Sequence, residues 1–402
     1  MRISQNVPSF DEIKLGKAVV FQRGFDITKR EQAEGNIPIV SSSGVSSYHN
    51  KWKVAGPGVV IGRKGTLGTV HYLKDNFWPH DTTLWIKDFK DNDPRLVSYF
   101  LQTLKLENFD TGSSNPTLNR NHLHKIKVLF PRHQVQKKIA AILSAYDDLI
   151  ENNRRRIALL EKMAEEIYRE WFVRMRFPGH DKLKLESIPL RSFIHEYIGG
   201  DWGEDEEGTK HANPVYVIRG TDFENVQQGD VSSVPLRFIK DSSLRSRKLR
   251  AGDIIVENSV NHQSRTTGKS LLITQHVLDL FGGNVICASF CKLVRPKNSK
   301  YSKLLSLNLR LLFEQGVFEY FQNVATNGIA NLQAERLMDK HTVPFHEDID
   351  VEVLNSLDTS QFTLQQANLS NTRDMLLPRL ISGKLSVENL DILLPPSMEE
   401  VA

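Results

Sequence analysis

The chain has 402 residues, of which 40% are apolar and 25% are charged, and its formal net charge is +4. This length accommodates two or three domains with ordinary packed cores. The first residues, MRISQNVPSF, contain no apolar stretch typical of a signal peptide, and no uncharged apolar run reaches the roughly 18 residues of a membrane span. We therefore expect a cytoplasmic protein with no membrane association.

Charge and cysteine usage narrow the function classes. Residues 1–345 carry a net charge of +11 and residues 346–402 carry −7. A basic body suits a polyanionic partner, although such a mild excess is also common in proteins that bind nothing charged. Cys287 and Cys291 lack further ligands at metal-site spacing, so we predict core thiols on an apolar strand and no metal.

Residues 1–131 are predicted to form a strand-rich domain. Short β-branched runs such as GVVIG (58–62) and TTLWI (82–86) alternate with glycine, proline and polar residues. Glycines 62, 65 and 68 lie in GRKGTLG between two such runs, so a strand–loop–strand hairpin is expected rather than a cofactor loop opening a helix. Such a hairpin brings Arg63, Lys64 and Thr66 close to a duplex backbone. A plain tight turn with solvated charges is the alternative.

Residues 132–178 are predicted to be a central spacer helix. The segment 132–173 contains neither glycine nor proline, and Phe177-Pro178-Gly179 ends it. Apolar residues recur at heptad spacing, with Asn153 as a polar position in the stripe. The corresponding stripe positions are Leu143, Tyr146, Ile150, Ile157, Leu160, Ala164, Ile167 and Trp171.

The second half repeats this organisation. Residues 179–345 contain strand-like runs, PVYVI (214–218), DIIVE (253–257) and KSLLI (269–273). A C-terminal spacer helix is predicted within 346–385, starting near residue 350, with a kink at Pro378, a stop at Gly383 and an acidic tail over 386–402. Its weaker heptad stripe contains Phe362, Leu369 and Leu376.

The alternation of globule and helix predicts an internal duplication. The landmarks are Pro38–Gly44 against Pro214–Gly220, Gly58 against Gly252, and the pair Leu118 and Leu123 against Leu332 and Leu337. A lone amphipathic rod needs a partner, and the other rod of the chain is the nearest one. We therefore predict an α+β fold with two mixed α/β domains, separated by two long helices packed as an antiparallel coiled coil with pseudo-two-fold symmetry.

The motifs of catalysis are incomplete throughout. Gly268-Lys269-Ser270 ends like a phosphate-binding loop, but Gln263 stands where the first glycine is needed. Asn213–Tyr216 lacks the second proline of amino-methyltransferases, and His80-Asp81 has no nucleophile beside it. The acidic run 204–207 is predicted to be a solvated loop. We predict no catalytic residues and no cofactor bound by this chain.

Polar loops favour nucleic-acid binding instead. Four of them, 39–53, 110–122, 236–250 and 257–269, are rich in residues that hydrogen-bond base edges or phosphates. One polar loop is usually only a loop, but two in each half, at corresponding places, point to DNA. The predicted DNA contacts are Ser41, Ser42, Ser43, Tyr48, His49, Lys51, Arg63, Lys64, Thr66, Ser114, Asn115, Arg219, Arg237, Arg245, Arg247, Lys248, Asn258, Asn261, Arg265 and Lys269.

Three stretches resemble the specificity subunits of type I restriction–modification systems, and with their spacing the resemblance covers essentially the whole chain. They are IPIVSSSGVSSYHNKWKVAGPGVVIGRKGTLGTVHYL with FWPHDTTLWI, then LFPRHQVQKKIAAILSAYDDLIENNRRRIALLEKMAEEIYREWF, and NLSNTRDMLLPRLISGKL. The resemblance implies that 1–131 and 179–345 are target-recognition domains, each binding one half of a split double-stranded DNA sequence. Ser41–Ser43, Tyr48, Arg63, Lys64 and Thr66 would then contact one half-site.

The same resemblance implies the partners. Two methyltransferase subunits would bind the helices, and restriction subunits, which are ATP-dependent translocases and endonucleases, would join them. S-adenosylmethionine and ATP with Mg²⁺ would belong to those partners. The second domain departs from the pattern, with VENSVNHQSRTTGKS in place of a compact glycine hairpin. A stand-alone bipartite DNA-binding protein and a coiled-coil assembly scaffold remain the alternatives.

Overall fold

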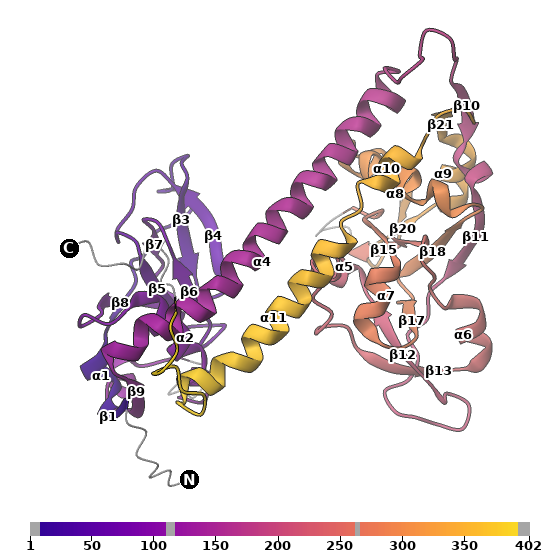
Figure 1. Cartoon of the computed structure of the whole chain (residues 1–402). Coiled ribbons are helices and arrows are strands. Elements are labelled where there is room, and N and C mark those ends of the chain that lie inside the picture. The colour runs from indigo at the N-terminus through magenta and orange to yellow at the C-terminus, as the bar shows by residue number, and fades with distance from the viewer. Residues whose placement is uncertain (1–8, 110–116, 262–265, 393–402) are drawn as a thin grey trace. The chain divides into compact units, whose positions relative to one another are not determined.

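The computed structural model describes residues 9–109, 117–261 and 266–392. The chain divides into two compact units, unit 1 with residues 1–148 and 370–402, and unit 2 with residues 149–369. Each long helix is therefore shared, with one part in each unit (Figure 1). Mixed helices and sheets within both units confirm the predicted α+β class.

The described strands of unit 1 form a four-stranded sheet in the order β2-β8-β5-β6, a three-stranded sheet β4-β3-β7 and a β1-β9 ribbon. The strands are β1 (Phe10–Lys14), β2 (Val20–Arg23), β3 (Ile37–Ser41), β4 (Gly44–His49), β5 (Gly58–Gly62), β6 (Val70–Leu73), β7 (Trp78–Pro79), β8 (Thr83–Asp88) and β9 (Lys127–Pro131). The short helices are α1 (Leu15–Ala18), α2 (Pro94–Gln102), η1 (Leu106–Phe109) and α3 (Arg120–Leu123).

The core of unit 1 forms where apolar strand faces meet helices. All residues of β5 are buried, and α2 packs over β5 and β6 (Figure 1). Helix α2 starts at Pro94 because the Asp93 carboxylate accepts a hydrogen bond from the N–H of Leu96 at 2.9 Å. Leu143 of the first long helix and Leu380 of the second join the same cluster. Unit 1 is thus a sheet domain completed by the ends of both helices.

Unit 2 has more strands and the same kind of layers. Its described sheets are β11-β18-β14-β16, β13-β12-β17, β15-β20-β19 and the ribbon β10-β21. The strands are β10 (Glu186–Pro189), β11 (Ile194–Gly199), β12 (Asn213–Ile218), β13 (Leu236–Ile239), β14 (Ile254–Glu257), β15 (Ser259–Asn261), β16 (Ser270–Leu272), β17 (Val285–Cys287), β18 (Cys291–Pro296), β19 (Gln322–Val324), β20 (Ile329–Leu332) and β21 (Thr342–Phe345).

The helices of unit 2 are mostly short. They are η3 (Leu190–Phe193), η4 (Gly220–Asp222), α5 (Phe223–Gln227), α6 (Asp241–Arg247), α7 (Gln275–Phe281), η5 (Ser299–Tyr301), α8 (Ser302–Glu314), η6 (Val317–Phe321), α9 (Ala334–Lys340) and α10 (Glu352–Ser356). Cys287 and Cys291 are buried cysteines of the core, as predicted. They lie on β17 and β18 rather than on one strand, because a turn separates them.

The predicted duplication is visible in the backbone hydrogen bonds. The N–H of Gly24 bonds to the carbonyl of Thr83 at 3.1 Å, and the N–H of Gly200 bonds to that of Cys291 at 3.1 Å. A Cβ on Gly24 would lie 2.0 Å from a carbonyl oxygen, that of His80, and a Cβ on Gly200 would lie 2.1 Å from the corresponding one. The same chain path, with the same close approach of backbone to backbone, therefore occurs in both units.

The predicted alignment of the two copies is only partly correct. Leu118 and Leu332 do correspond, since their N–H groups bond to the carbonyls of Arg63 and Asn258 at 3.0 and 2.8 Å. However, the parallel strand pairs align Val40 with Ile218, which shifts the proposed match of the two prolines by two residues. The match of Gly58 to Gly252 is also wrong, by one residue. Strand pairing fixes the register, whereas the landmarks were too few to do so.

The first long helix, α4 (His133–Tyr168), continues as a π-helical segment, η2 (Arg169–Val173), and confirms the helix predicted over 132–173. Every predicted heptad position on it is buried or half-buried. Leu143, Ile150 and Ile157 are each less than 9% exposed. The periodicity therefore identified the inward face of the helix.

The C-terminal helix differs from the prediction. The segment starting near residue 350 is broken into α10 and α11 (Ser360–Ile381), because Asp358 accepts a hydrogen bond from the N–H of Ser360 at 3.0 Å and starts a new helix. Helix α11 continues through Pro378, and Gly383, with φ of +71°, follows its end as predicted.

Part of the predicted acidic tail is structured. Val387 is 2% exposed and lies in the core of unit 1, and the Lys138 ammonium donates to the carbonyls of Glu388 and Leu390 at 2.8 Å each. Residues 393–402 lie outside the described part. Among the described helices, none is long and apolar enough to cross a membrane.

Candidate DNA-binding interface

The turn between β7 and β8 organises the predicted contacts of unit 1. The carbonyl oxygen of Thr82 accepts three hydrogen bonds, from the Ser42 hydroxyl at 2.7 Å, the Arg63 N–H at 2.9 Å and the Lys64 N–H at 3.0 Å. Ser42 belongs to the predicted polar loop 39–53, and Arg63 and Lys64 belong to the predicted glycine hairpin. The structure therefore brings them together around one backbone atom, although Ser42 itself is only 5% exposed.

The glycine hairpin has the predicted strand–loop–strand form. Gly65 and Gly68 have φ of +76° and +74°, and a Cβ on Gly62 would lie 2.0 Å from the carbonyl oxygen of Thr66. Only glycine fits this close approach, so the loop between β5 and β6 is tightly folded. Lys64 and Thr66 are exposed on it.

Asp81 holds two arginines at this surface. The Arg23 guanidinium donates to the Asp81 carboxylate at 2.7 Å, and that of Arg63 donates to the Asp81 carbonyl at 3.2 Å. Partial burial, together with the neighbouring charge of Arg23, holds the pKa of Arg63 below its usual value. Arg23 was not predicted, because a single arginine at the end of β2 carries no local signal and Asp81 is 58 residues away.

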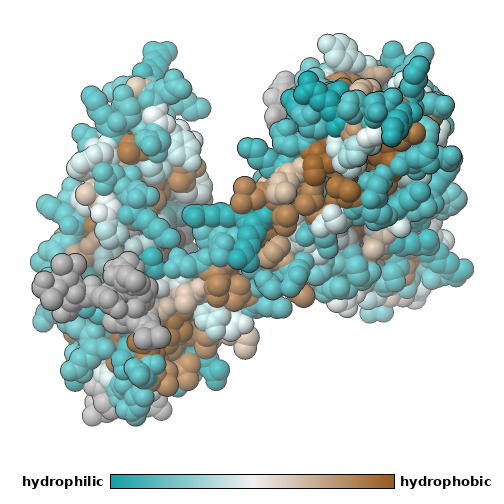
Figure 2. Space-filling view, turned by 45° about the horizontal axis from the view of Figure 1, so that its top comes forward, coloured by the Kyte–Doolittle hydropathy of each residue, from teal (hydrophilic) through white to brown (hydrophobic). Residues whose placement is uncertain are grey.

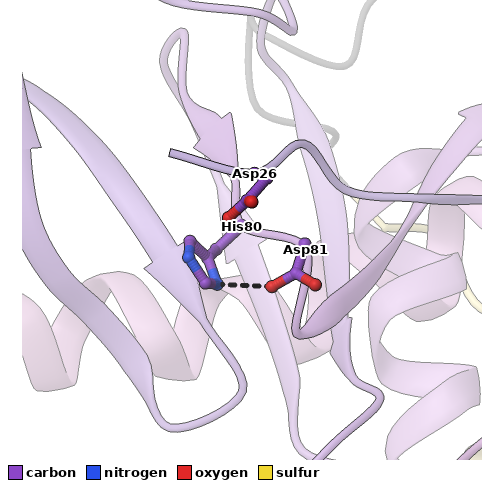
Figure 3. A group of neighbouring side chains, drawn as sticks. All are labelled: Asp26, His80 and Asp81. Atoms are coloured by element: carbon purple, nitrogen blue, oxygen red, sulfur yellow. Dashed lines mark ion pairs between the residues drawn. The ribbon is translucent and has the colours of Figure 1, made fainter. Parts of the chain in front are cut away.

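Asp26, His80 and Asp81 form a group that sequence analysis did not predict (Figure 3). One ligand atom from each lies within 4.8 Å of the others, as a metal site would require. The His80 ring nitrogen Nδ1 is 3.3 Å from the Asp81 carboxylate and 3.1 Å from the Thr82 hydroxyl. Burial raises the pKa of Asp81, but the hydrogen bond from Arg23 and the charges of His80, Arg23 and Lys64 outweigh burial. The pKa of Asp81 is therefore lower than usual.

These positive neighbours decide how the group is interpreted. A metal ion would have to displace the Arg23 guanidinium from Asp81 and would lie beside further cationic side chains. Asp81 is therefore better understood as the anchor of a basic surface than as a metal ligand.

The other predicted contacts of unit 1 divide into exposed and interior residues. Ser43, Lys51 and Tyr48 are exposed, Tyr48 to 57%, and the Ser41 hydroxyl lies 3.2 Å from that of Ser43. His49 is interior at 5% exposed, where Nδ1 accepts a hydrogen bond from a backbone N–H and the ring meets Trp78 edge-on. We treat His49 as structural. Ser114 and Asn115 lie outside the described residues.

Two predicted arginines of unit 2 are used by the fold. Arg237 is 8% exposed and donates to the carbonyls of Trp202 and Gly203 at 3.2 Å each. Arg219 makes two hydrogen bonds to the Asp222 carboxylate, at 2.9 and 2.8 Å, and a third to a backbone carbonyl. Both guanidinium groups therefore have hydrogen-bond partners within unit 2.

The stretch 236–250 is less turn-rich than expected. It forms β13 and then α6, with Asp241 in the first turn and Arg245 and Arg247 in the last, which matches the helix dipole. Arg245 is exposed and pairs with Asp241, whereas Arg247 donates to the carbonyl of Gly199 at 2.8 Å. Lys248 is exposed at the helix end.

A polar chain lies at the start of β15. The Asn258 side chain accepts from the Tyr197 hydroxyl at 3.2 Å and donates to the Ser259 hydroxyl at 3.1 Å, which donates to Asn331 at 2.6 Å. The carbonyl of Phe290 accepts the N–H groups of Asn258 and Ser259 at 2.9 and 3.1 Å, as Thr82 does in unit 1. Asn258 is therefore the counterpart of Arg63.

The remaining predicted contacts of unit 2 are less informative. Lys269 pairs with Glu224 at 2.8 Å. Asn261 ends β15, but its side chain is not described, and Arg265 lies outside the described residues. Lys269 also lines a cavity of about 350 Å³, where Arg310 pairs with Glu165 at 2.8 Å and lies 3.8 Å from Glu161. Charges of both signs line this cavity, which does not suit a polyphosphate.

Comparison with known proteins identifies the family. Residues 14–162 match the type I restriction modification DNA specificity domain. The specificity subunit of the type I restriction enzyme MjaIX from Methanocaldococcus jannaschii is 38% identical over 325 residues, which span 71% of this chain and 66% of that relative, just under two thirds. The EcoprrI specificity subunit from Escherichia coli is 25% identical over 125 residues, which span 31% of each chain.

The fold agrees with these matches. The crystal structure of the type I restriction–modification S subunit from M. genitalium has a TM-score of 0.58 to this chain at 15% identity, and the alignment covers 95% of this chain and 98% of that one. Sequence motifs, family match and fold lead to one conclusion. The chain belongs to the family of DNA-specificity subunits of type I restriction–modification systems.

Proposed function

We propose that this chain is the DNA-reading subunit of a type I restriction–modification complex, in which each unit contacts one half of a bipartite duplex target. The observation that carries the proposal is the repeated turn. In both units one backbone carbonyl, of Thr82 or of Phe290, fixes the start of a loop that holds predicted DNA contacts. The side chains on the two loops differ, so one scaffold presents two chemistries to two half-sites.

The charge at the first turn supports DNA as the ligand. Arg23, Arg63 and Lys64 gather around Asp81, and exposed Lys51 and Thr66 belong to the neighbouring loops. Arginine and lysine donate to guanine and to phosphates, and hydroxyl groups bond to phosphate oxygens. We assign unit 1 to one half-site through these residues.

We further propose that the chain is not catalytic and acts in the cytoplasm. Among the described residues, Asp26, His80 and Asp81 are arranged like metal ligands, but the Arg23 guanidinium already pairs with Asp81. The cavity beside Lys269 is lined by both acidic and basic side chains. Two methyltransferase subunits and the restriction subunits would supply the chemistry, with S-adenosylmethionine and with ATP and Mg²⁺ respectively. The specificity subunit would supply the choice of sequence.

The long helices are proposed as the spacer and the docking surface for the methyltransferase subunits. Helix α4 has 36 residues. It also exposes large apolar side chains, with Leu159 at 61% and Met163 at 51%. Figure 2 shows apolar areas on one face of a mostly hydrophilic surface. Close packing of α4 against α11 as an antiparallel coiled coil belongs to this proposal.

A selection experiment tests the function. The full chain, together with the methyltransferase subunits of its host, is incubated with duplexes that contain a long randomised region, and the bound DNA is sequenced. We expect a motif of two specified blocks separated by a fixed unspecified gap. A stand-alone DNA-binding protein would give the same motif without the partner subunits, whereas an assembly scaffold would bind no duplex even at low salt.

A further inference from the structure

The turns 80–82 and 288–290 occupy the same place in the duplicated scaffold. His80 and Ala288 each place their N–H 2.9 Å from the carbonyl at the end of the neighbouring strand. The carbonyls of Thr82 and Phe290 each accept two backbone N–H groups, from the residues that begin the loop after β5 and the segment after β14. Positions in the two units can therefore be paired one by one.

The paired positions carry different kinds of side chain, mostly charged in unit 1 and small or aromatic in unit 2. The strand pairs β2–β8 and β11–β18 align Arg23 with Gly199, and the turns align Asp81 with Ser289 and Thr82 with Phe290. Two further replacements extend the contrast, since Ala288 stands for His80 and Trp202 for Asp26. A charged cluster in unit 1 thus becomes a small and aromatic surface in unit 2.

In unit 1 the geometry favours guanine. One nitrogen of the Arg23 guanidinium is held by the Asp81 carboxylate at 2.7 Å, while the side chain is 53% exposed. A guanidinium fixed by a carboxylate has lost much of its conformational freedom and still presents other N–H groups. Guanine offers the matching pair of acceptors, O6 and N7, in the major groove.

In unit 2 the geometry favours thymine. The Phe290 side chain is 61% exposed although its backbone is fixed by two hydrogen bonds. A solvent-exposed aromatic ring on a fixed backbone gains free energy when it covers an apolar group. The apolar group that DNA presents in the major groove is the 5-methyl of thymine.

We propose that Arg23, oriented by Asp81, contacts a guanine in the half-site of unit 1, and that Phe290 contacts the 5-methyl group of a thymine at the corresponding place in the half-site of unit 2. This inference rests on the proposed function, because it specifies how two units of one scaffold recognise different sequences. It identifies Arg23, Asp81 and Phe290 as specificity-determining residues.

Modified bases test the inference in the assembled complex. Once the selected motif is known, each guanine of the first block is replaced in turn by 7-deazaguanine, and each thymine of the second block by uracil. We expect one 7-deazaguanine to weaken binding by about fivefold or more and one uracil by about fourfold, which corresponds to one hydrogen bond and one methyl group. Arg23→Gln should abolish the first effect and Phe290→Ser the second.

Matched variants separate this proposal from general effects. Arg132 is also an exposed arginine, at 53%, that pairs with an aspartate, Asp11, at 2.8 Å, so Arg132→Gln should leave both base effects intact. Phe290→Leu keeps an apolar side chain and should retain sensitivity to uracil, and Asp81→Asn should weaken discrimination at the guanine.

The outcomes separate a failure of the proposed function from a failure of this inference. A selection that gives no bipartite motif contradicts the proposed function itself. This inference is overturned, and the proposed function stands, if the motif is bipartite but neither modified base changes the affinity. The same holds if Arg23→Gln and Phe290→Ser lose as much affinity on the modified bases as the unaltered chain does.

Discussion

Removing the two cations of the glycine hairpin should change how DNA binding depends on salt. Lys64 is exposed, so its ammonium is available to a phosphate. Arg63 is half-buried and donates to the Asp81 carbonyl at 3.2 Å, so it also holds the turn in place. The variants Lys64→Ala, Arg63→Ala and the double substitution therefore separate charge from positioning.

The size of the effect follows from counterion release. Each phosphate neutralised contributes about 0.9 to the slope of log affinity against log salt. Lys64→Ala should lower the slope by about 0.9, which is about a fivefold loss of affinity at 0.15 M salt when binding at 1 M is unchanged. The double variant should lower it by up to about 1.8, and Arg63→Ala should lose more affinity than its charge explains.

Fluorescence anisotropy with the selected duplex, in the assembled complex, measures these slopes between about 50 and 300 mM salt. Lys127 provides the control, because it is 72% exposed on the β1–β9 ribbon and pairs with Glu12 at 3.4 Å. Lys127→Ala should leave the slope unchanged. If the double variant kept the slope of the unaltered chain, the hairpin would not contact phosphates and the assignment of unit 1 would be wrong.

Three further predictions concern stability. Ile157→Asp places a charge at a position that is 8% exposed and should lower the free energy of unfolding in urea by about 3 kcal/mol or more. Leu159→Asp, at a position 61% exposed, should change it by less than about 0.5 kcal/mol. Equal effects of the two variants would contradict the heptad assignment. Gly268→Ala should lower the melting temperature and the free energy of unfolding, the latter by about 2 kcal/mol or more, because its φ is +102° and the added Cβ would lie 2.4 Å from the Phe318 ring. An unchanged melting temperature would show that this loop is not packed as described. Burial lowers the pKa of His341 from 6.5, so the unfolded chain binds the proton more readily and the free energy of unfolding should fall as the pH drops below about 6.5. His341→Gln should flatten this dependence when denaturation is measured between about pH 5 and 7.5. An identical slope would exclude His341 as its source.

The candidate site shows which part of a site can be predicted from sequence. The glycine spacing in GRKGTLG predicted the hairpin and its exposed Lys64 and Thr66, because tight turns depend on nearby residues. Arg23 and Asp81, however, are 58 residues apart, and each is unremarkable in its own stretch. Polar composition also gave no information on burial, so His49 and Arg237 were predicted as DNA contacts although both lie in the interior.

The sequence by itself determined the local and periodic features of this protein. Helix α4 follows from an uninterrupted heptad pattern without glycine or proline, and strands such as β5 and β14 follow from short β-branched runs between turn residues. The sequence motifs of the glycine hairpin and of the two long helices were sufficient to indicate the family. Each of these signals is contained in a contiguous segment, and neighbouring residues alone create it.

Only the tertiary structure decided how the two copies correspond and which side chains meet. The alignment of Arg23 with Gly199 and of Thr82 with Phe290 comes from strand pairing and from hydrogen bonds between distant segments. A register shift of one residue moves every side chain to the other face of a strand, so spacing in the sequence cannot substitute for the pairing itself. The difference between a charged and an aromatic surface at one place in the scaffold therefore became visible only in three dimensions.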